Sequence, residues 1–253
     1  MDAHLAPRSV PLSPTLHPEN QQALHALLCG IGRELRDPLA GLRTGFDQLL
    51  GDAPEPIPPE LQSHVATITG LCDELLRLAG GYLEYADAVR GPSPTRPEVL
   101  TLGAIVSDLD RRFGGKARDR GLIFETAVAA ADAQVVADPG RCARIFDNLI
   151  NNAIAYTPSG GRVRVEAGLD GDTWILTVED DGPGIPADSQ TRVFEPFHRL
   201  NRDEHSSTPG EGLGLSVCRE LVAQLRGQIV LQSAADQGAR FTVVLPKSPG
   251  AMA

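Results

Sequence analysis

One acidic residue and two glycines follow closely on a strand-like run, and their types suit the recognition of a flat ring that carries an amine. The run Thr173–Val178 alternates in the manner of a strand, and Asp180, Gly182 and Gly184 come just after it. A carboxylate accepts hydrogen bonds from an exocyclic amine, while glycines let a ring approach bare backbone. The pattern alone is equally typical of an acidic turn, so its meaning depends on its surroundings.

Two asparagines upstream of this turn suit Mg²⁺ and phosphate chemistry. Asn148 and Asn152 lie in a stretch with the helical apolar spacing of Ile145, Leu149 and Ala153. Residues four apart share one helix face, so both amides are expected to point at one spot. Mg²⁺ takes oxygen ligands and keeps several of its waters, which amide oxygens allow.

A glycine cluster downstream is predicted to open a helix that binds phosphates. Gly210, Gly212 and Gly214 precede a helical stretch over residues 215–225. Free backbone N–H groups and the positive end of the helix dipole favour an anion at such a start. The polar segment 201–209 before the cluster has the composition of a mobile nucleotide lid.

Together with Phe194-Glu195-Pro196-Phe197, these segments form four motifs in a fixed order over about 70 residues. They resemble the N, G1, F and G2 boxes of the histidine kinase ATP-binding domain. The resemblance implies binding of Mg-ATP, with Asn152 as the metal ligand, Asn148 also in catalysis and Tyr156 beside the adenine. The implied nucleotide-site residues are Asn148, Asn152, Tyr156, Asp180, Gly182, Gly184, Phe197, Arg199, Gly210, Gly212, Leu213, Gly214 and Leu215.

Two other nucleotide-binding patterns are excluded. A P-loop requires Gly-x-x-x-x-Gly-Lys-Ser/Thr, and the segment Gly114–Ala117 lacks both the spacing and the hydroxyl. A dinucleotide fingerprint requires Gly-x-Gly-x-x-Gly directly after a strand. Residues 210–214 read Gly-x-Gly-x-Gly and follow a polar loop instead.

Two stretches with coiled-coil-like apolar spacing precede these motifs. Over residues 19–50 and 61–89, apolar positions recur at alternating intervals of four and three, and the proline-rich segment 51–59 turns the chain between them. We expect an antiparallel helical hairpin. Because one hairpin cannot cover its own seam, two copies are expected to form a four-helix bundle as a parallel homodimer.

The first of these helices contains a segment that resembles the phosphoacceptor box of the same family, with its histidine replaced. Residues 33–39 read Arg-Glu-Leu-Arg-Asp-Pro-Leu, where the family has His-Glu-Leu-Arg-x-Pro-Leu. Arg33 stands at this degenerate acceptor position, and a guanidinium has five donors and no acceptor nitrogen. Glu34, which in the family orients or deprotonates the histidine, is predicted to be catalytic but lacks that partner. Asp37 occupies the phosphatase position, where the family has Thr or Asn.

Four further positions bear on catalysis. Ala155 stands where the family often has a phosphate-binding lysine, and Arg199 is predicted to compensate in part. His25 and His64 are alternative acceptors, although both are predicted to lie on solvated helix faces.

The chain as a whole is predicted to be an α+β protein. Helices over 102–118 and 139–155 interleave with strands near 123–126, 134–137, 162–167, 173–178, 228–232 and 240–245. This pattern predicts an α/β sandwich with a mixed sheet, similar to the ATP-binding (Bergerat, or GHKL) fold of histidine kinases, gyrase, Hsp90 and MutL. The expected parts are a leader (1–18), the helical hairpin (19–90), a linker (91–97), the ATP-binding domain (98–247) and a tail (248–253).

Composition narrows the partners and the compartment. The 253 residues carry a formal net charge of −10, so no basic footprint for nucleic acid is expected. Four scattered cysteines without Cys-x-x-Cys spacing predict reduced thiols and a cytoplasmic protein. No apolar run approaches the roughly 20 residues that span a bilayer, so no membrane span is expected.

The resemblance implies a two-component histidine kinase. Such an enzyme uses ATP to phosphorylate a histidine and then relays the phosphoryl group to an aspartate of a response-regulator receiver domain. Because Arg33 replaces the acceptor, the alternative is an ATP-binding pseudokinase that docks a response regulator or a partner kinase. An ATP-driven clamp is disfavoured because no transducer segment follows residue 247.

Overall fold

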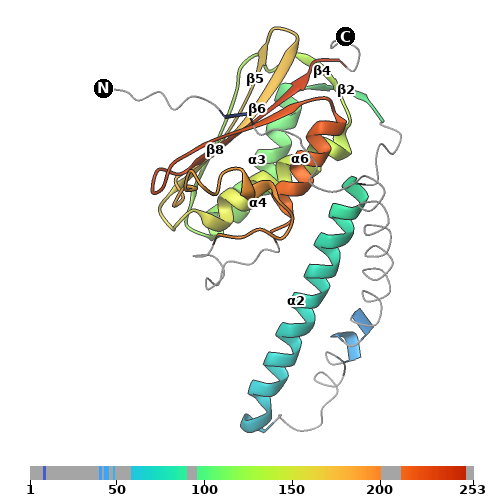
Figure 1. The fold of residues 1–253 in the computed structure, drawn as a ribbon, viewed down its shortest axis with the longest axis vertical. Helices are drawn as coiled ribbons and strands as arrows, with labels where there is room; N and C mark the ends of the chain where they lie inside the picture. Colours follow the sequence, from blue (N-terminus) through green and yellow to red (C-terminus); the bar gives the residue numbers. More distant parts are fainter. Residues whose placement is uncertain are drawn as a thin grey trace. The chain divides into compact units, whose positions relative to one another are not determined.

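The chain divides into two compact units, residues 14–90 and residues 1–13 with 91–253 (Figure 1). The structure, a computed structural model, describes residues 8–9, 40–41, 43–45, 48, 58–89, 96–200 and 212–248. Arg33, Glu34, Asp37, His25, Gly210 and most of the predicted first helix lie outside the described residues.

The helical unit contains one long helix, α2 (Pro59–Val89). Proline at the first helical position needs no hydrogen bond and has a suitable φ, and Glu60 in the first turn complements the helix dipole. The described residues between 40 and 48 are also helical. Arg43 forms an ion pair with Asp73 of α2, so the two helical segments lie side by side as the predicted hairpin requires.

Helix α2 has one broad apolar side that is only partly covered. Cys72 and Ala79 are buried, whereas a stripe at intervals of three, four and three residues is exposed. The members of this exposed stripe are Ile68, Leu71, Leu75 and Leu78. The predicted seam of this helix runs through Ile68, Cys72, Leu75 and Ala79, and the structure covers Cys72 and Ala79 but leaves Ile68 and Leu75 exposed.

The second unit is built on a six-stranded sheet of order β1-β7-β8-β6-β5-β3. Every neighbouring pair is antiparallel except β3 and β5, which are parallel, so the predicted mixed sheet is confirmed. The strands are β1 (Arg8–Ser9), β3 (Ile123–Val128), β5 (Arg162–Asp170), β6 (Thr173–Asp180), β7 (Gln228–Ser233) and β8 (Ala239–Pro246). A separate antiparallel pair joins β2 (Glu98–Thr101) to β4 (Gln134–Ala137).

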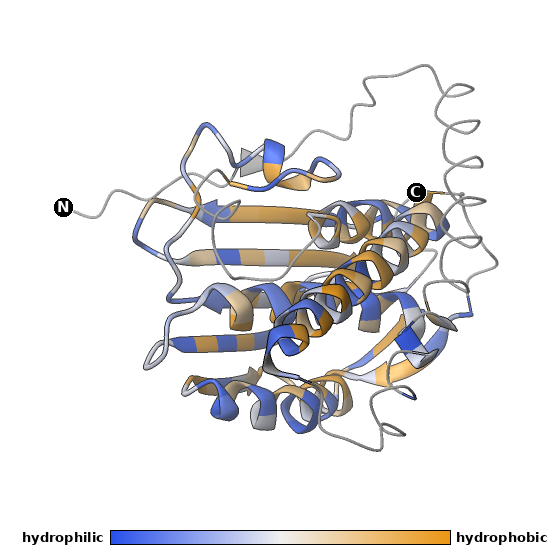
Figure 2. Ribbon diagram, turned by 90° about the horizontal axis from the view of Figure 1, so that it is seen from below, coloured by the Kyte–Doolittle hydropathy of each residue, from blue (hydrophilic) through white to orange (hydrophobic). Residues whose placement is uncertain are grey.

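Three helices pack on one face of the six-stranded sheet: α3 (Leu102–Asp119), α4 (Pro139–Tyr156) and α6 (Gly214–Gln224). A short 3₁₀ turn, η1 (Arg192–Phe194), precedes α6. Side chains alternate between the faces of a strand, and Figure 2 shows the matching alternation of hydropathy along the ribbons. The inward residues Trp174, Leu176 and Val178 of β6 are buried and form the core with the apolar sides of the helices.

Side-chain caps fix where two of these helices begin. Asp138 accepts a hydrogen bond from the backbone N–H of Arg141 at 3.0 Å, with Pro139 at the first helical position of α4. Thr101 accepts one from the N–H of Ala104 at 3.2 Å and so caps α3. Such caps satisfy N–H groups that the helix itself leaves unpaired.

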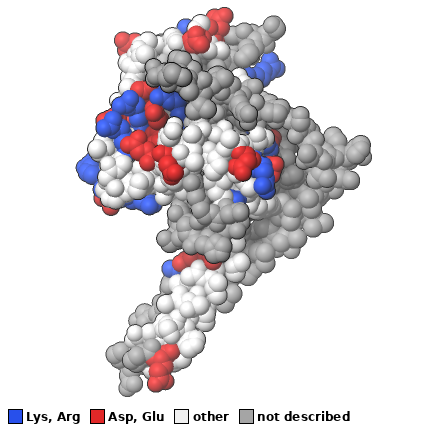
Figure 3. Space-filling view, turned by 60° about the vertical axis from the view of Figure 1, so that its left-hand side comes forward, with Lys and Arg blue, Asp and Glu red and all other residues white. Residues whose placement is uncertain are grey.

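The outer face of the sheet carries a row of alternating charges. Glu125, Arg164, Glu179 and Arg240 are register partners on β3, β5, β6 and β8. Arg164 bonds to Glu125 at 3.0 Å, and Arg240 pairs with Glu179. Figure 3 shows acidic and basic side chains interspersed in the described part. The side chains of these pairs are 37–42% exposed, and ion pairs with such access to solvent contribute little stability.

Candidate nucleotide-binding site

Strand periodicity selects Asp180 from three consecutive acidic residues. Glu179 lies on the outer face of β6, where it pairs with Arg240. Asp180 takes the next inward position after Val178 and is only 9% exposed. Asp181 follows the strand and is exposed. A single carboxylate therefore enters the helix-covered side of the sheet.

The surroundings of Asp180 make it a poised hydrogen-bond acceptor. Burial raises the pKa of its carboxyl to about 6, and hydrogen bonds from the backbone N–H groups of Gly182 and Ala239 oppose that rise. The Gly182 N–H donates to Asp180 Oδ1 at 2.8 Å. At neutral pH the side chain is ionised in a site with little water, where an amine donor from a ligand would be bound strongly.

The two glycines after Asp180 are required by close backbone approach. A Cβ on Gly182 would lie 2.6 Å from Asp180 Oδ1 and 3.4 Å from the carbonyl oxygen of Tyr156. Gly184 has φ +63°, and a Cβ there would overlap the carbonyl oxygen of Ala234. The end of α4, where Tyr156 lies, is thus held against the glycine turn.

Replacing Gly184 with alanine is expected to destabilise this unit by about 1–3 kcal/mol more than replacing Gly171 with alanine. Both glycines have positive φ, which strains an L-residue, but Gly171 at φ +57° has open space around it. The difference between the two variants therefore isolates the overlap with Ala234.

Urea unfolding followed by tryptophan fluorescence measures this difference. Trp174 is the only tryptophan of the chain and is fully buried beneath the helices, so its signal reports this unit. Equal stabilities of the two variants would show that the Gly184 turn is loosely held.

Two polar side chains that the sequence analysis did not single out lock the glycine turn onto the β7–β8 connection. Ser233 Oγ accepts from the Ile185 N–H at 2.7 Å and donates to the Gly238 carbonyl at 2.6 Å. Gln190 Nε2 donates to the carbonyl oxygens of Ile185 and Ser233 at 3.0 and 2.8 Å. These bonds fix the backbone that a ring would lie against.

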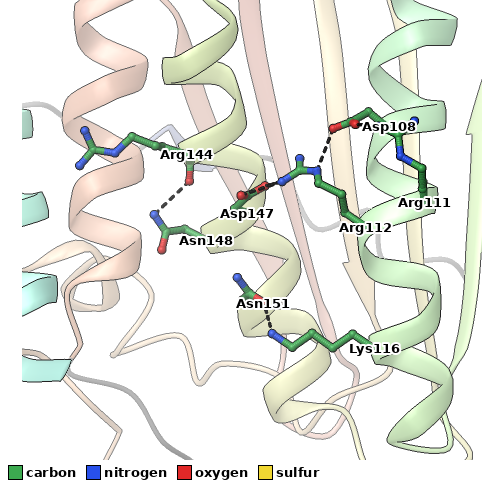
Figure 4. Close-up of polar contacts among 8 residues, drawn as sticks. All are labelled: Asp108, Arg111, Arg112, Lys116, Arg144, Asp147, Asn148 and Asn151. Atoms are coloured by element: carbon green, nitrogen blue, oxygen red, sulfur yellow. Dashed lines mark hydrogen bonds and ion pairs between the residues drawn. The ribbon is translucent and has the colours of Figure 1, made fainter. Parts of the chain in front are cut away.

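The predicted asparagine face is present on α4 and meets the start of α6. Asn148 Nδ2 donates to the carbonyl oxygen of Arg144 at 3.0 Å, as Figure 4 shows. A Cβ on Gly214 would lie 3.0 Å from Asn148 Oδ1, so the first residue of α6 adjoins this amide oxygen. Asn152 is half-buried one turn further along α4.

The start of α6 offers backbone donors. Its N-cap residue, Leu213, makes no side-chain capping bond, and Ser216 Oγ donates to the Leu213 carbonyl at 2.7 Å instead of accepting from an N–H. Among the residues that the structure describes, no N-cap side chain accepts from the first N–H groups of this helix, and such a start suits an anion. Leu213 is buried and Leu215 is half-buried, so the predicted positions surround this helix start.

The donor set fits a magnesium ion that arrives with its phosphates. In the part of the chain that the structure describes, no group of three or more His, Cys, Asp or Glu side chains is placed to hold a metal. The amide oxygens of Asn148 and Asn152 remain, and Mg²⁺ accepts such ligands together with waters and phosphate oxygens. Asn152 is the residue that would hold the ion, which would neutralise phosphate charge.

Backbone pairing ties together the two ends of the segment predicted as a lid. The Phe197 N–H donates to the Gly212 carbonyl at 3.0 Å. Gly212 has φ +72°, and a Cβ there would lie 2.8 Å from the His198 carbonyl oxygen, which explains the glycine. Phe197 itself has φ +63° and a side chain that is 54% exposed. The F and G2 boxes are therefore joined, while residues 201–211 lie outside the described part.

Two further predicted positions, Arg199 and His64, lie within the described residues. Arg199 is half-buried just after the F box, and its predicted role toward phosphate stays a prediction. His64 is exposed on α2, as expected, and its Nδ1 lies 3.0 Å from the Glu60 carbonyl oxygen. Its role as an alternative acceptor is also still a prediction.

Known proteins are similar to this chain in sequence and in fold. Residues 137–249 match the family described as "Histidine kinase-, DNA gyrase B-, and HSP90-like ATPase". The signal transduction histidine-protein kinase BaeS of Escherichia coli (strain K12) is 32% identical over 235 residues, which cover 90% of this chain and 48% of BaeS.

Two solved structures are also similar. Full-length ShkA, in complex with AMPPNP, superposes with a TM-score of 0.72 and 26% identity over 91% of this chain and 46% of that one. The mycobacterial sensor histidine kinase MprB matches 61% of this chain and 99% of its own with 31% identity and a TM-score of 0.50.

The chain belongs to the histidine kinase family and contains its catalytic core. It spans half or less of the length of the curated relatives it matches, for example 35% of the alginate biosynthesis sensor protein KinB of Pseudomonas aeruginosa and 48% of BaeS. Within the described helices, none combines the length and apolar character that crossing a bilayer requires.

Proposed function

We propose that this chain is the ATP-binding and dimerising core of a two-component histidine kinase. The observation that carries the proposal is the buried, ionisable Asp180 beside a glycine turn that cannot accommodate side chains. In this proposal Asp180 accepts a hydrogen bond from the adenine amine, and the backbone of the turn covers the ring. The junction of Asn148 with Gly214 receives the phosphates, and Asn152 holds Mg²⁺.

The proposed reaction is transfer of the γ-phosphoryl group of ATP to a histidine, followed by relay to an aspartate of a response-regulator receiver domain. Arg33 cannot be the acceptor, so the histidine is elsewhere in this chain or on a partner kinase. Arg33 is also the one observation that favours a second candidate, an ATP-binding docking protein without kinase activity. Membership of the kinase family favours the enzyme. The cytoplasmic location predicted from the cysteines belongs to this proposal as well.

Incubation with radiolabelled ATP, alone and with a candidate partner kinase or receiver domain, tests the proposal. Label that is lost in acid and retained in base marks phosphohistidine and supports the enzyme. Tight ATP binding without any label on either protein would support the docking function instead. Failure to bind ATP would contradict both.

The exposed stripe of α2 is expected to pair with a second copy of the chain. Ile68, Leu71, Leu75 and Leu78 form a continuous apolar line, and Leu71 is 55% exposed. Spacing of three and four residues is the pattern by which helices pack in bundles. We propose a homodimer through this hairpin.

Leu71→Glu/Leu75→Glu is expected to convert the dimer to a monomer at micromolar concentration, because two carboxylates would be buried in an apolar interface. Light scattering of the full chain measures the change. Ser63→Glu, which adds a carboxylate to an exposed position of α2 off the stripe, should stay dimeric. A monomeric unaltered chain would contradict the proposal.

A further inference from the structure

Helices α3 and α4 are joined by three polar contacts in strict register. Arg112 Nη1 donates to both carboxylate oxygens of Asp147 at 2.7 and 2.8 Å. One turn further, Lys116 Nζ donates to Asn151 Oδ1 at 2.6 Å. These contacts join residues 35 positions apart, so the two helices run in parallel and present matching faces (Figure 4).

The third contact, again one turn further, differs in its acceptor. Arg120 Nη2 donates to the backbone carbonyl of Ala155 at 3.4 Å. The side chain of Ala155 is only a methyl group, so position 155 contributes no charge. The positive charges beside this part of α4 come from Lys116 and Arg120.

Only the first contact neutralises its cation. Arg112 faces Asp147 and also bonds to Asp108 at 2.8 Å, so two carboxylates balance it. Lys116 instead faces a neutral amide, and it forms no ion pair among the described residues. Its charge is therefore available to an anion that comes near.

The position of Lys116 places that charge beside the asparagine face. Asn151, which holds the lysine ammonium, directly precedes Asn152 and lies one turn beyond Asp147 on the α3 side of α4. Ala155 lies one turn further along α4. It is four residues after Asn151 and three after Asn152, so it shares a side of the helix with both. A lysine carries its ammonium on a flexible four-carbon stem, so it can leave a neutral amide for a phosphate within several ångströms.

We propose that Lys116 of α3 binds the phosphates of the nucleotide and supplies the cation that position 155 of α4 lacks. Arg120 is a weaker candidate because it lies a further turn from Asn148. The proposal rests on the nucleotide binding proposed above. Lys116 lies outside the four motifs that define the site.

Lys116→Ala is expected to weaken ATP binding about three- to tenfold at low ionic strength, with a smaller effect on ADP and none on adenosine. The loss should shrink as salt is raised, because the side chain is exposed and screened. Arg118→Ala is the matched control, since it removes one exposed positive charge from the same helix. That control should change ATP binding less than twofold. Isothermal titration calorimetry with the full chain measures all three ligands.

A second variant tests whether a cation at position 155 can replace the Lys116 ammonium. Adding Ala155→Lys to the Lys116→Ala protein is expected to restore ATP affinity to within about twofold of the unaltered chain. Equal effects of Lys116→Ala and Arg118→Ala, an equal loss for adenosine and ATP, or no recovery with Ala155→Lys would each overturn the proposal. If the unaltered chain binds no ATP, the proposed function itself is wrong. If it binds ATP but Lys116→Ala behaves like Arg118→Ala, only the role of Lys116 is wrong.

Discussion

Asp180→Asn is expected to weaken ATP binding by about ten- to a hundredfold at pH 8, because the adenine amine loses its carboxylate acceptor in a site with little water. The side chain is 9% exposed, so water cannot replace the lost partner fully. Calorimetric titration of both proteins with ATP measures the loss. Asp181→Asn is the control, since that neighbouring carboxylate is exposed and its affinity change should be below about twofold.

The same substitution is expected to have the opposite effect on the stability of the nucleotide-free protein. Burial raises the pKa of Asp180 from 3.8 to about 6, so the folded protein favours the protonated form. The stabilisation from this group is full below pH 3.8 and is lost as pH rises through 6. At pH 8 the ionised side chain thus opposes folding by up to about 3 kcal/mol.

A pH series separates this ionisation from any other effect of the asparagine. Relative to the unaltered protein, the free energy of unfolding of Asp180→Asn should rise by about 1–3 kcal/mol between pH 4 and pH 8. Urea unfolding followed by Trp174 fluorescence measures both proteins. A difference that does not depend on pH would mean that Asp180 is not desolvated, and equal ATP affinities would remove it from the nucleotide site.

Local sequence signals determine most of the second unit, and they were sufficient to predict it. Helix α4 was predictable because Asp138 and Pro139 mark its start and apolar residues recur with helical spacing up to Tyr156. Strand β4 was also predicted with its observed ends. Strand β1 was missed because two residues carry no alternation. Strand β2 is as long as β4, but it has no buried position and directly follows the proline-rich segment 91–97, so it was missed as well.

In the helical hairpin, apolar periodicity predicts the helices but not which of their apolar residues are covered. Spacing of three and four identifies a packed helix, but it does not say which apolar residues face the same chain and which face another. Cys72 is buried whereas Leu71, one residue before it, is exposed. Which part of one apolar side is covered depends on where the neighbouring helix lies, and the spacing does not give that position.

The site was predictable to the extent that its residues belong to short motifs. Asp180, Gly182 and Gly184 form a short motif that is visible in the sequence, because backbone that approaches closely at these two positions requires glycine. Ser233 and Gln190 were missed because they act through backbone contacts made across the fold, and common polar residues leave no pattern. Lys116 could not be assigned to the site from the sequence, because its approach to α4 depends on the register of two helices.

Arg33→His is expected to give acid-labile autophosphorylation at position 33, at least about tenfold above the background of the unaltered protein. A neutral imidazole has a nucleophilic nitrogen, whereas a guanidinium has none. Glu34 and the rest of the acceptor box remain in the sequence around it. Radiolabelled ATP, acid treatment and mass spectrometry of the labelled peptide measure and place the phosphate.

The rate of that gain depends on the phosphate site. With Ala at position 155, transfer should be slow, and adding Ala155→Lys to Arg33→His should raise the rate because a further cation stabilises the transferring group. Phosphate on His25 or His64 in the unaltered protein would show that the chain already has an acceptor and would remove the docking function. An inert Arg33→His protein that still binds ATP would mean that the nucleotide-binding unit has lost catalysis as well, and docking would then be the remaining function.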